Sequence, residues 1–137
     1  SLDETPDGRY LITLTGVCRF AVGPELPTVR GYRRVQADWS AFRCDIEGDP
    51  KRVEIDRERL LAALRPFFEA RGISVDWQAS SRTPEPRLVT SLAMVCPFDA
   101  TEKQALLEAP DVEARARTLL ALIEMAVLAQ DGDKARH

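Results

Sequence analysis

Residues 45–68, DIEGDPKRVEIDRERLLAALRPFF, decide the fold, because the spacing of apolar residues changes within them. Before this stretch apolar and polar side chains alternate, which is typical of a strand with one buried face. From Leu60 onward apolar residues recur every three or four positions, as in an amphipathic helix. The polar segment Asp45–Pro50 contains a glycine and a proline and is the best candidate for a linker. We therefore expect a strand-forming part, residues 1–50, followed by a helical part, residues 51–137.

Two segments of the first part have the pattern of strands. Residues Tyr10–Val22 predict one long half-buried strand in which Gly16 marks a bend or a bulge. The segment Gly23–Pro27 breaks that strand, and Tyr32–Phe42 resumes the alternation. We expect the second strand to run antiparallel to the first.

The first helix of the second part carries signals at both ends. Asp56 is a good N-cap, with Ile55 and Leu60 at the spacing of a hydrophobic staple. Gly72 is expected at C′, and Pro66 inside the helix is expected to kink it.

Further helices follow from the same rules. We expect a short helix within Ile73–Ser81, a helix from Pro86 that Pro97 terminates, one capped by Asp99 and Glu102, and a last one capped by Asp111. Residues 130–137 are expected to be a frayed polar tail. The predicted common core contains Leu64, Phe68, Leu92, Leu120 and Ile123. The predicted class is α+β, a β-hairpin followed by a bundle of about four helices.

Composition excludes several classes of function. The net charge of −3 is spread evenly, so neither half has the basic patch typical of nucleic-acid or membrane binding. Cys18, Cys44 and Cys96 are odd in number and far apart, which argues against a disulfide framework or a zinc site. No apolar run reaches the roughly 18–20 residues of a bilayer span, and no signal peptide is present. We expect a cytoplasmic protein without metal or cofactor.

The sequence contains no catalytic constellation. Its single histidine, His137, is the last residue, where a general base would lack a fixed position. Glu85 could form an acid–base pair with Asp99 or with Asp111, but helix capping and exposed surface explain all three residues better. We therefore expect a protein that is not an enzyme.

Three stretches together resemble a known family. They are Asp7-Gly8-Arg9-Tyr10 leading to Gly16-Val17-Cys18-Arg19-Phe20, then Tyr32-Arg33-Arg34-Val35, then Met94–Phe98 with Glu102–Glu108. The order and spacing resemble the amino-terminal domain of Lon proteases and of bacterial stand-alone proteins built from it. The resemblance implies a PUA-like β-barrel followed by a helical subdomain that recognises unfolded or tagged protein substrates.

Two differences from that family limit what the resemblance implies. The apolar, proline-rich segment with which the family domain begins does not occur in this sequence, so residues 1–50 correspond to a partial barrel without its first strands. The sequence also has no G-x-x-x-x-G-K-[ST] motif, so neither the ATPase nor the Ser-Lys protease activity of Lon is implied.

Four residues are candidates for substrate binding. Trp39 and Trp77 could line a groove for apolar peptides, and Tyr32 lies beside the arginine cluster that includes Arg34. The same cluster of Arg30, Arg33 and Arg34 leaves an RNA-binding PUA-like protein as the second hypothesis, with a small-molecule sensor as the third. Because a barrel without its first strands leaves an open edge, we also expect a homodimer formed through residues 9–42.

Overall fold

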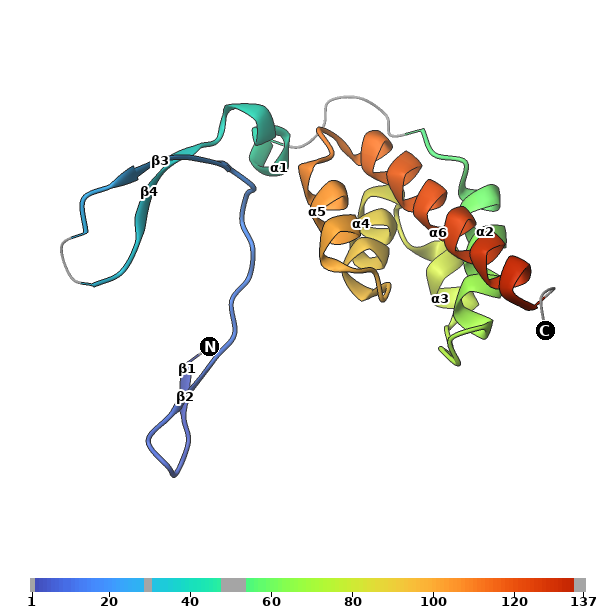
Figure 1. Cartoon of the computed structure of the whole chain (residues 1–137), viewed down its shortest axis with the longest axis horizontal. Helices are drawn as coiled ribbons and strands as arrows, with labels where there is room; N and C mark the ends of the chain where they lie inside the picture. Colours follow the sequence, from blue (N-terminus) through green and yellow to red (C-terminus); the bar gives the residue numbers. More distant parts are fainter. Residues whose placement is uncertain (1, 29–30, 48–53, 135–137) are drawn as a thin grey trace. The chain divides into compact units, whose positions relative to one another are not determined.

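The computed structural model describes residues 2–28, 31–47 and 54–134, and the chain divides into two compact units (Figure 1). Unit 1 is Ser1–Gly48 and unit 2 is Asp49–His137. Over the described residues, unit 1 carries two small antiparallel sheets and unit 2 is helical. The predicted α+β class is confirmed, and the described strands form no closed barrel.

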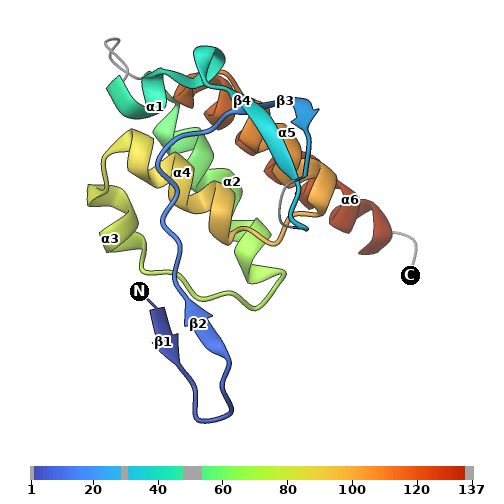
Figure 2. The ribbon, with the colours of Figure 1, turned by 90° about the vertical axis from the view of Figure 1, so that its left-hand side faces the viewer.

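The first sheet of unit 1 is a short hairpin of β1 (Leu2–Glu4) and β2 (Tyr10–Ile12) (Figure 2). Its turn uses Gly8, whose positive φ of 78° is a conformation that glycine adopts without strain. The prediction of a single strand over Tyr10–Val22 was wrong, because residues 13–20 are not in a strand. Alternation predicts which side chains share a face, but a strand also needs a hydrogen-bonded neighbour, and no described strand pairs with this segment.

The second sheet pairs β3 (Ala21–Leu26) with β4 (Arg34–Asp38) in antiparallel register. The antiparallel pairing was predicted, but the partner is 21–26 and not the earlier segment. The strand does not break at Gly23 and Pro24, because it absorbs them as a bulge between Val22 and Glu25. A short 3-10 turn η1 (Ser40–Phe42) and helix α1 (Cys44–Glu47) follow, so Asp45–Glu47 of the predicted linker are helical and its remainder lies outside the described residues.

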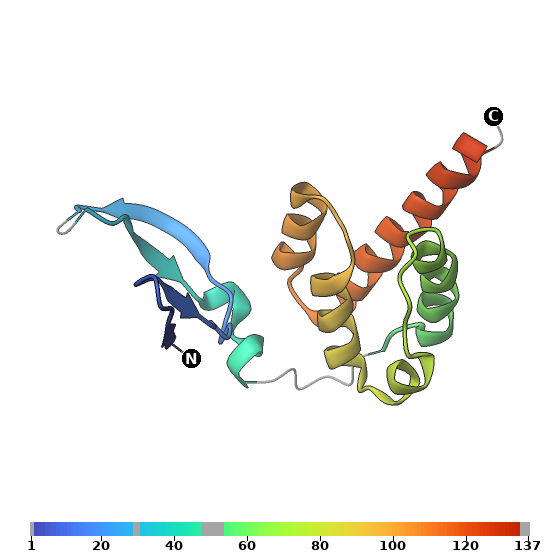
Figure 3. The same cartoon turned by 90° about the horizontal axis from the view of Figure 1, so that it is seen from below.

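Unit 2 contains five described helices, where the sequence predicted about four. They are α2 (Arg57–Glu69), α3 (Trp77–Arg82), α4 (Glu85–Val95), α5 (Ala100–Glu108) and α6 (Val112–Lys134). The long helix α6 packs against α2, α4 and α5 (Figures 1 and 3). It also continues through 130–134, so the prediction of a frayed tail was wrong for these residues.

The helix ends follow the predicted capping. The Asp56 carboxylate accepts a hydrogen bond from the Arg59 N–H at 2.9 Å. At the other end of α2, Gly72 has φ 64°, and the N–H of Ile73 donates to the carbonyl of Phe68 at 3.0 Å, as in a Schellman motif. Asp99 and Glu102 form the predicted capping box.

The hydrophobic core lies in unit 2. Its most deeply buried large side chains are Phe67, Phe68, Leu64, Leu119, Ile123, Val89 and Cys96. Of the five predicted core residues, Leu64, Phe68 and Ile123 are buried, whereas Leu92 and Leu120 are partly buried and pack against the core from its margin. Leu119, the neighbour of Leu120, faces the centre of the core instead.

Candidate functional site

Unit 1 exposes large apolar side chains on the β3–β4 hairpin. The register sets Val22 opposite Ala37 and Glu25 opposite Val35, so these side chains share one face of the hairpin. Phe20 lies two residues before Val22, and Trp39 lies two residues after Ala37, so both extend that face. The centroids of their rings lie 5.1 Å apart. We call Phe20, Val22, Val35, Ala37 and Trp39 the apolar face.

The apolar face is open to solvent. Val22 is 72% exposed, Trp39 49% and Phe20 42%, and Val35 and Ala37 are partly exposed. Contact between the two rings forms an aromatic pair at one end of the face. Large apolar patches that stay open to solvent mark interaction sites in soluble domains.

A polar clamp holds the chain beside the apolar face. The Arg19 guanidinium donates to both carboxylate oxygens of Asp45 at 2.8 Å, and the backbone N–H of Arg19 donates to the same carboxylate at 3.0 Å. The guanidinium also lies over the Phe42 ring, 4.4 Å from its centroid. Hydrogen bonding to Asp45 raises the pKa of Arg19 further above its ordinary value. The clamp ties the segment that precedes β3 to α1, next to Phe20.

Cys18 belongs to the same clamp. Its thiol donates to the carbonyl oxygen of Phe42 at 3.4 Å, and burial of the thiol raises its pKa. A neutral, hydrogen-bonded thiol has little nucleophilic character. This clamp could not be predicted from the sequence, because residues 19 and 45 are 26 positions apart and no local motif relates them.

Charged residues lie at the end of the apolar face nearest the turn between β3 and β4, where Glu25 of β3 shares that face. Arg33 donates to Glu25 at 2.8 Å, and both side chains are largely exposed. This hydrogen bond raises the pKa of Arg33. Tyr32 and Arg34 are also exposed, and Arg30, the third arginine of the predicted cluster, lies outside the described residues. The cluster is therefore mixed in charge, with an acid inside it.

The four predicted binding residues divide between the units. Tyr32, Arg34 and Trp39 lie on or beside β4, whereas Trp77 lies in α3 of unit 2. The Trp77 ring is 6.4 Å from Phe68, with the Arg65 guanidinium 4.7 Å from its centroid, so it covers the margin of the helical core. Of the three residues in unit 1, Trp39 belongs to the apolar face, and Arg34 projects from the opposite side of β4.

The acidic residues considered for catalysis have structural roles. Asp99 caps α5, and Asp111 accepts from the N–H of Ala114 at 2.7 Å at the start of α6. Glu85 lies 3.5 Å from Arg57. His137 lies outside the described residues. Within the described ranges, no group of three or more His, Cys, Asp or Glu side chains is placed to hold a metal ion.

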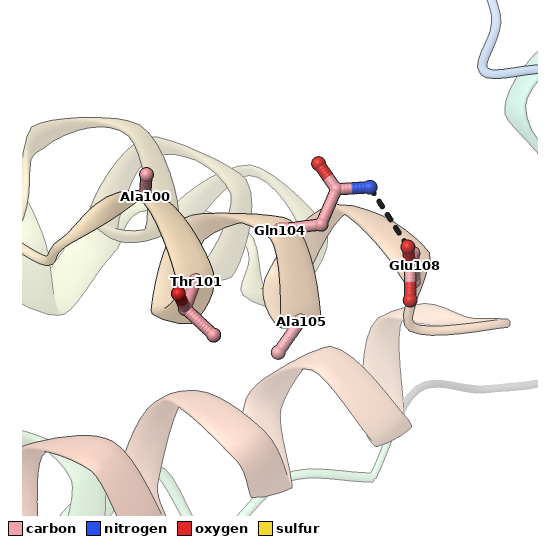
Figure 4. Close-up of a pocket in the computed structure, with 5 residues that line it drawn as sticks. All are labelled: Ala100, Thr101, Gln104, Ala105 and Glu108. Carbon is pink, nitrogen blue, oxygen red and sulfur yellow. Dashed lines mark hydrogen bonds between the residues drawn. The ribbon is translucent and has the colours of Figure 1, made fainter.

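A shallow hollow lies along the outer side of α5 (Figure 4). Its described lining is Ala100, Thr101, Gln104, Ala105 and Glu108. The Gln104 amide donates to the Glu108 carboxylate at 2.8 Å, one helical turn away. The amide and the carboxylate therefore pair with each other along one helix, and we place no site here.

An α+β chain with a helical core and an exposed apolar sheet face has the features of a binding module. Comparison with protein families gives its affiliation. Residues 1–125 match the model of the ATP-dependent protease La (LON) substrate-binding domain, and the chain belongs to that family. The resemblance stated from the sequence is thereby confirmed.

Searches of curated proteins and of solved structures gave no match. Among the helices that the structure describes, none is both long and apolar enough to cross a lipid bilayer.

Proposed function

We propose that this chain is a non-catalytic module that binds unfolded protein segments, and that the apolar face of unit 1 is the surface on which they lie. The observation that carries the proposal is the face itself, where Phe20, Val22 and Trp39 stand together and exposed. The family supports the general role, since it is a family of substrate-binding domains.

The chemistry of the apolar face suits an unfolded polypeptide. Unfolded chains expose apolar side chains that a folded protein buries, and transfer of apolar surface out of water is favourable without requiring a particular sequence. A half-exposed Trp39 supplies the large, rigid contact typical of binding hot spots. Such a site selects for exposed apolar character, which is how unfolded proteins differ from folded ones.

The charges around the face favour a protein over RNA as the ligand. Binding to a phosphate backbone depends on unpaired basic groups, and Arg33 is already hydrogen bonded to Glu25. The net charge of the chain is −3. An adaptor role, in which the bound client is passed to another protein, is part of the same proposal.

A matched pair of substitutions tests the site. Val22 and Leu128 are 72% and 70% exposed, on β3 and α6 respectively, so Val22→Glu and Leu128→Glu add the same charge at equally exposed apolar positions. Binding of a labelled, permanently unfolded protein is measured by fluorescence anisotropy. We expect Val22→Glu to weaken binding by about tenfold or more, because it removes apolar contact and buries a charge. Leu128→Glu should stay within about twofold.

Three outcomes would contradict the proposal. Equal loss in both variants would mean that added charge, and not the apolar face, decides binding. Tighter binding of single-stranded RNA, with affinity falling steeply as salt is raised, would favour the RNA hypothesis. Cleavage of the unfolded protein, seen on a gel and abolished by one substitution, would show that the chain is an enzyme.

A further inference from the structure

The open edge of β4 has backbone groups free for pairing. In the described part of the chain, β3 is the only strand beside β4. A Cβ placed on Gly23 of β3 would lie 2.7 Å from the carbonyl oxygen of Gln36, so this carbonyl faces β3. Because the backbone groups of successive residues point to opposite sides of a strand, the N–H and C=O of Val35 and Ala37 face the open edge.

The sequence of β4 is complementary in charge to an antiparallel copy of itself. It reads Arg34-Val35-Gln36-Ala37-Asp38. With a two-fold axis at Gln36, Arg34 of each copy stands opposite Asp38 of the other, and Val35 stands opposite Ala37. Arg34, Gln36 and Asp38 lie on the side of β4 away from the apolar face, since side chains alternate along a strand.

The charges of Arg34 and Asp38 are available for an ion pair with a second copy of the chain. Arg34 is exposed. Hydrogen bonding from the Ser40 side chain, and then from the Ser40 N–H at 2.9 Å, lowers the pKa of the Asp38 carboxyl, so Asp38 is ionised at neutral pH. Within one copy the two charges are four residues apart on an extended strand, roughly 13 Å, too far for an ion pair.

We propose that two copies of the chain pair through their β4 edges about this axis, forming a four-stranded antiparallel sheet in the order β3-β4-β4-β3. Each of the two Val35–Ala37 pairs exchanges two backbone hydrogen bonds, and an Arg34–Asp38 ion pair closes each end. The two apolar faces then lie on the same side of one sheet. The dimer therefore doubles the apolar surface along one continuous face.

The other described strands are poorer candidates for the same contact. Antiparallel self-pairing of β1 would set Asp3 against Asp3. β3 contains the bulge and Pro24, which has no N–H to donate. β2, Tyr10–Ile12, carries no charge that would fix a register. β4 is the strand whose sequence specifies both the partner and the alignment.

Two single charge reversals test the pairing. In Arg34→Asp both ends of β4 are acidic, and in Asp38→Arg both ends are basic, so each variant repels its own copy. A one-to-one mixture restores an acidic residue opposite a basic one at both ends. We expect sedimentation of the full chain, from about 10 µM to about 1 mM, to show a dimer of the original sequence. Each variant alone should dissociate about tenfold more readily, and the mixture should associate as well as the original chain.

Ala37→Pro provides an independent measurement. It removes an N–H that faces the open edge and leaves the β3 pairing of Gln36 in place, so it should abolish the dimer without changing the circular dichroism spectrum. A monomer at every concentration would overturn the proposal, and so would a dimer indifferent to the charge reversals or a mixture that fails to associate. An original chain that stays monomeric and instead adds an extended client polypeptide at this edge would also overturn it.

Discussion

Replacing Leu119 by alanine should destabilise unit 2 strongly. Leu119 lies on α6 with 0% of its surface exposed, in the core cluster that also contains residues of α2 and α4. The substitution removes three carbon atoms from a site without solvent, which costs about 0.8 kcal/mol per carbon in transfer free energy. The cavity adds to this, since the surrounding helices relax only partly. We expect a total loss of about 3–5 kcal/mol in the free energy of unfolding.

Two leucines on the same helix serve as controls. Leu128 is 70% exposed, so Leu128→Ala should change the free energy of unfolding by less than about 0.5 kcal/mol. Leu120, which is partly buried, should give a value between the two. Urea denaturation followed by circular dichroism at a helical wavelength measures all three variants, with the slope m as a check that the same structure unfolds. A loss below about 1 kcal/mol for Leu119→Ala, or equal losses for the three variants, would refute the assignment of the buried side of α6.

Three further predictions concern particular contacts. Gly23→Ala should open the β3–β4 hairpin, because the new Cβ would lie 2.7 Å from the Gln36 carbonyl oxygen. Gly16→Ala is the control, because no atom lies within 4 Å of a Cβ at that position. Amide hydrogen exchange in the hairpin should be faster in the first variant only. Asp99→Ala should cost unit 2 about 1 kcal/mol of unfolding free energy through loss of the capping box, and Asp99→Ser should recover most of it in the same denaturation assay. Burial raises the pKa of Cys96 from 9.0 to about 11, so the thiol should resist alkylation at pH 8 in the folded chain. The thiol ionises at a lower pH in the unfolded chain than in the folded one, so the free energy of unfolding of unit 2 should fall as pH rises from about 9 to about 11. Denaturation at several pH values measures this, with Cys96→Ala as the control. Alkylation of native Cys96 as fast as Cys44 would contradict its burial.

The helical unit could be predicted largely from sequence because its signals are local. Asp56, Asp99 and Gly72 each act within three or four residues of their own position, through side-chain or backbone hydrogen bonds that short spacing makes possible. The face of α6 was less certain. Leu119 and Leu120 are adjacent and equally apolar, so periodicity alone did not decide which one points to the centre.

The sheet unit was harder to predict because its contacts are not local. Apolar and polar residues do alternate over 10–22, but a strand also needs a hydrogen-bonded partner strand, which this pattern does not identify. In the structure only the two ends of this segment lie in strands. The bulge at Gly23 and Pro24 appears as a strand break when only turn chemistry is considered. The Arg19–Asp45 clamp joins charges from separate elements, and only the fold brings them within 2.8 Å.

The binding role of the candidate residues stays a prediction. Trp39 lies on the apolar face, and Tyr32 and Arg34 lie on or beside the same strand. Phe20 and Val22 were not candidates from the sequence, because only the pairing of β3 with β4 and the contact between the Phe20 and Trp39 rings place them on that face. Trp77 has the same residue type but covers the helical core. Residue type alone does not separate a binding aromatic from a packing one, because both gain by leaving water.

Hydrogen–deuterium exchange of the chain, with and without a saturating, permanently unfolded protein, tests directly whether the apolar face binds the client. We expect bound client to slow exchange in peptides covering 20–26 and 34–39, which carry the apolar face, and to leave exchange in the exposed helix segment around Met125 and Leu128 unchanged. Protection confined to unit 2, with the β3–β4 hairpin exchanging as in the free chain, would contradict it.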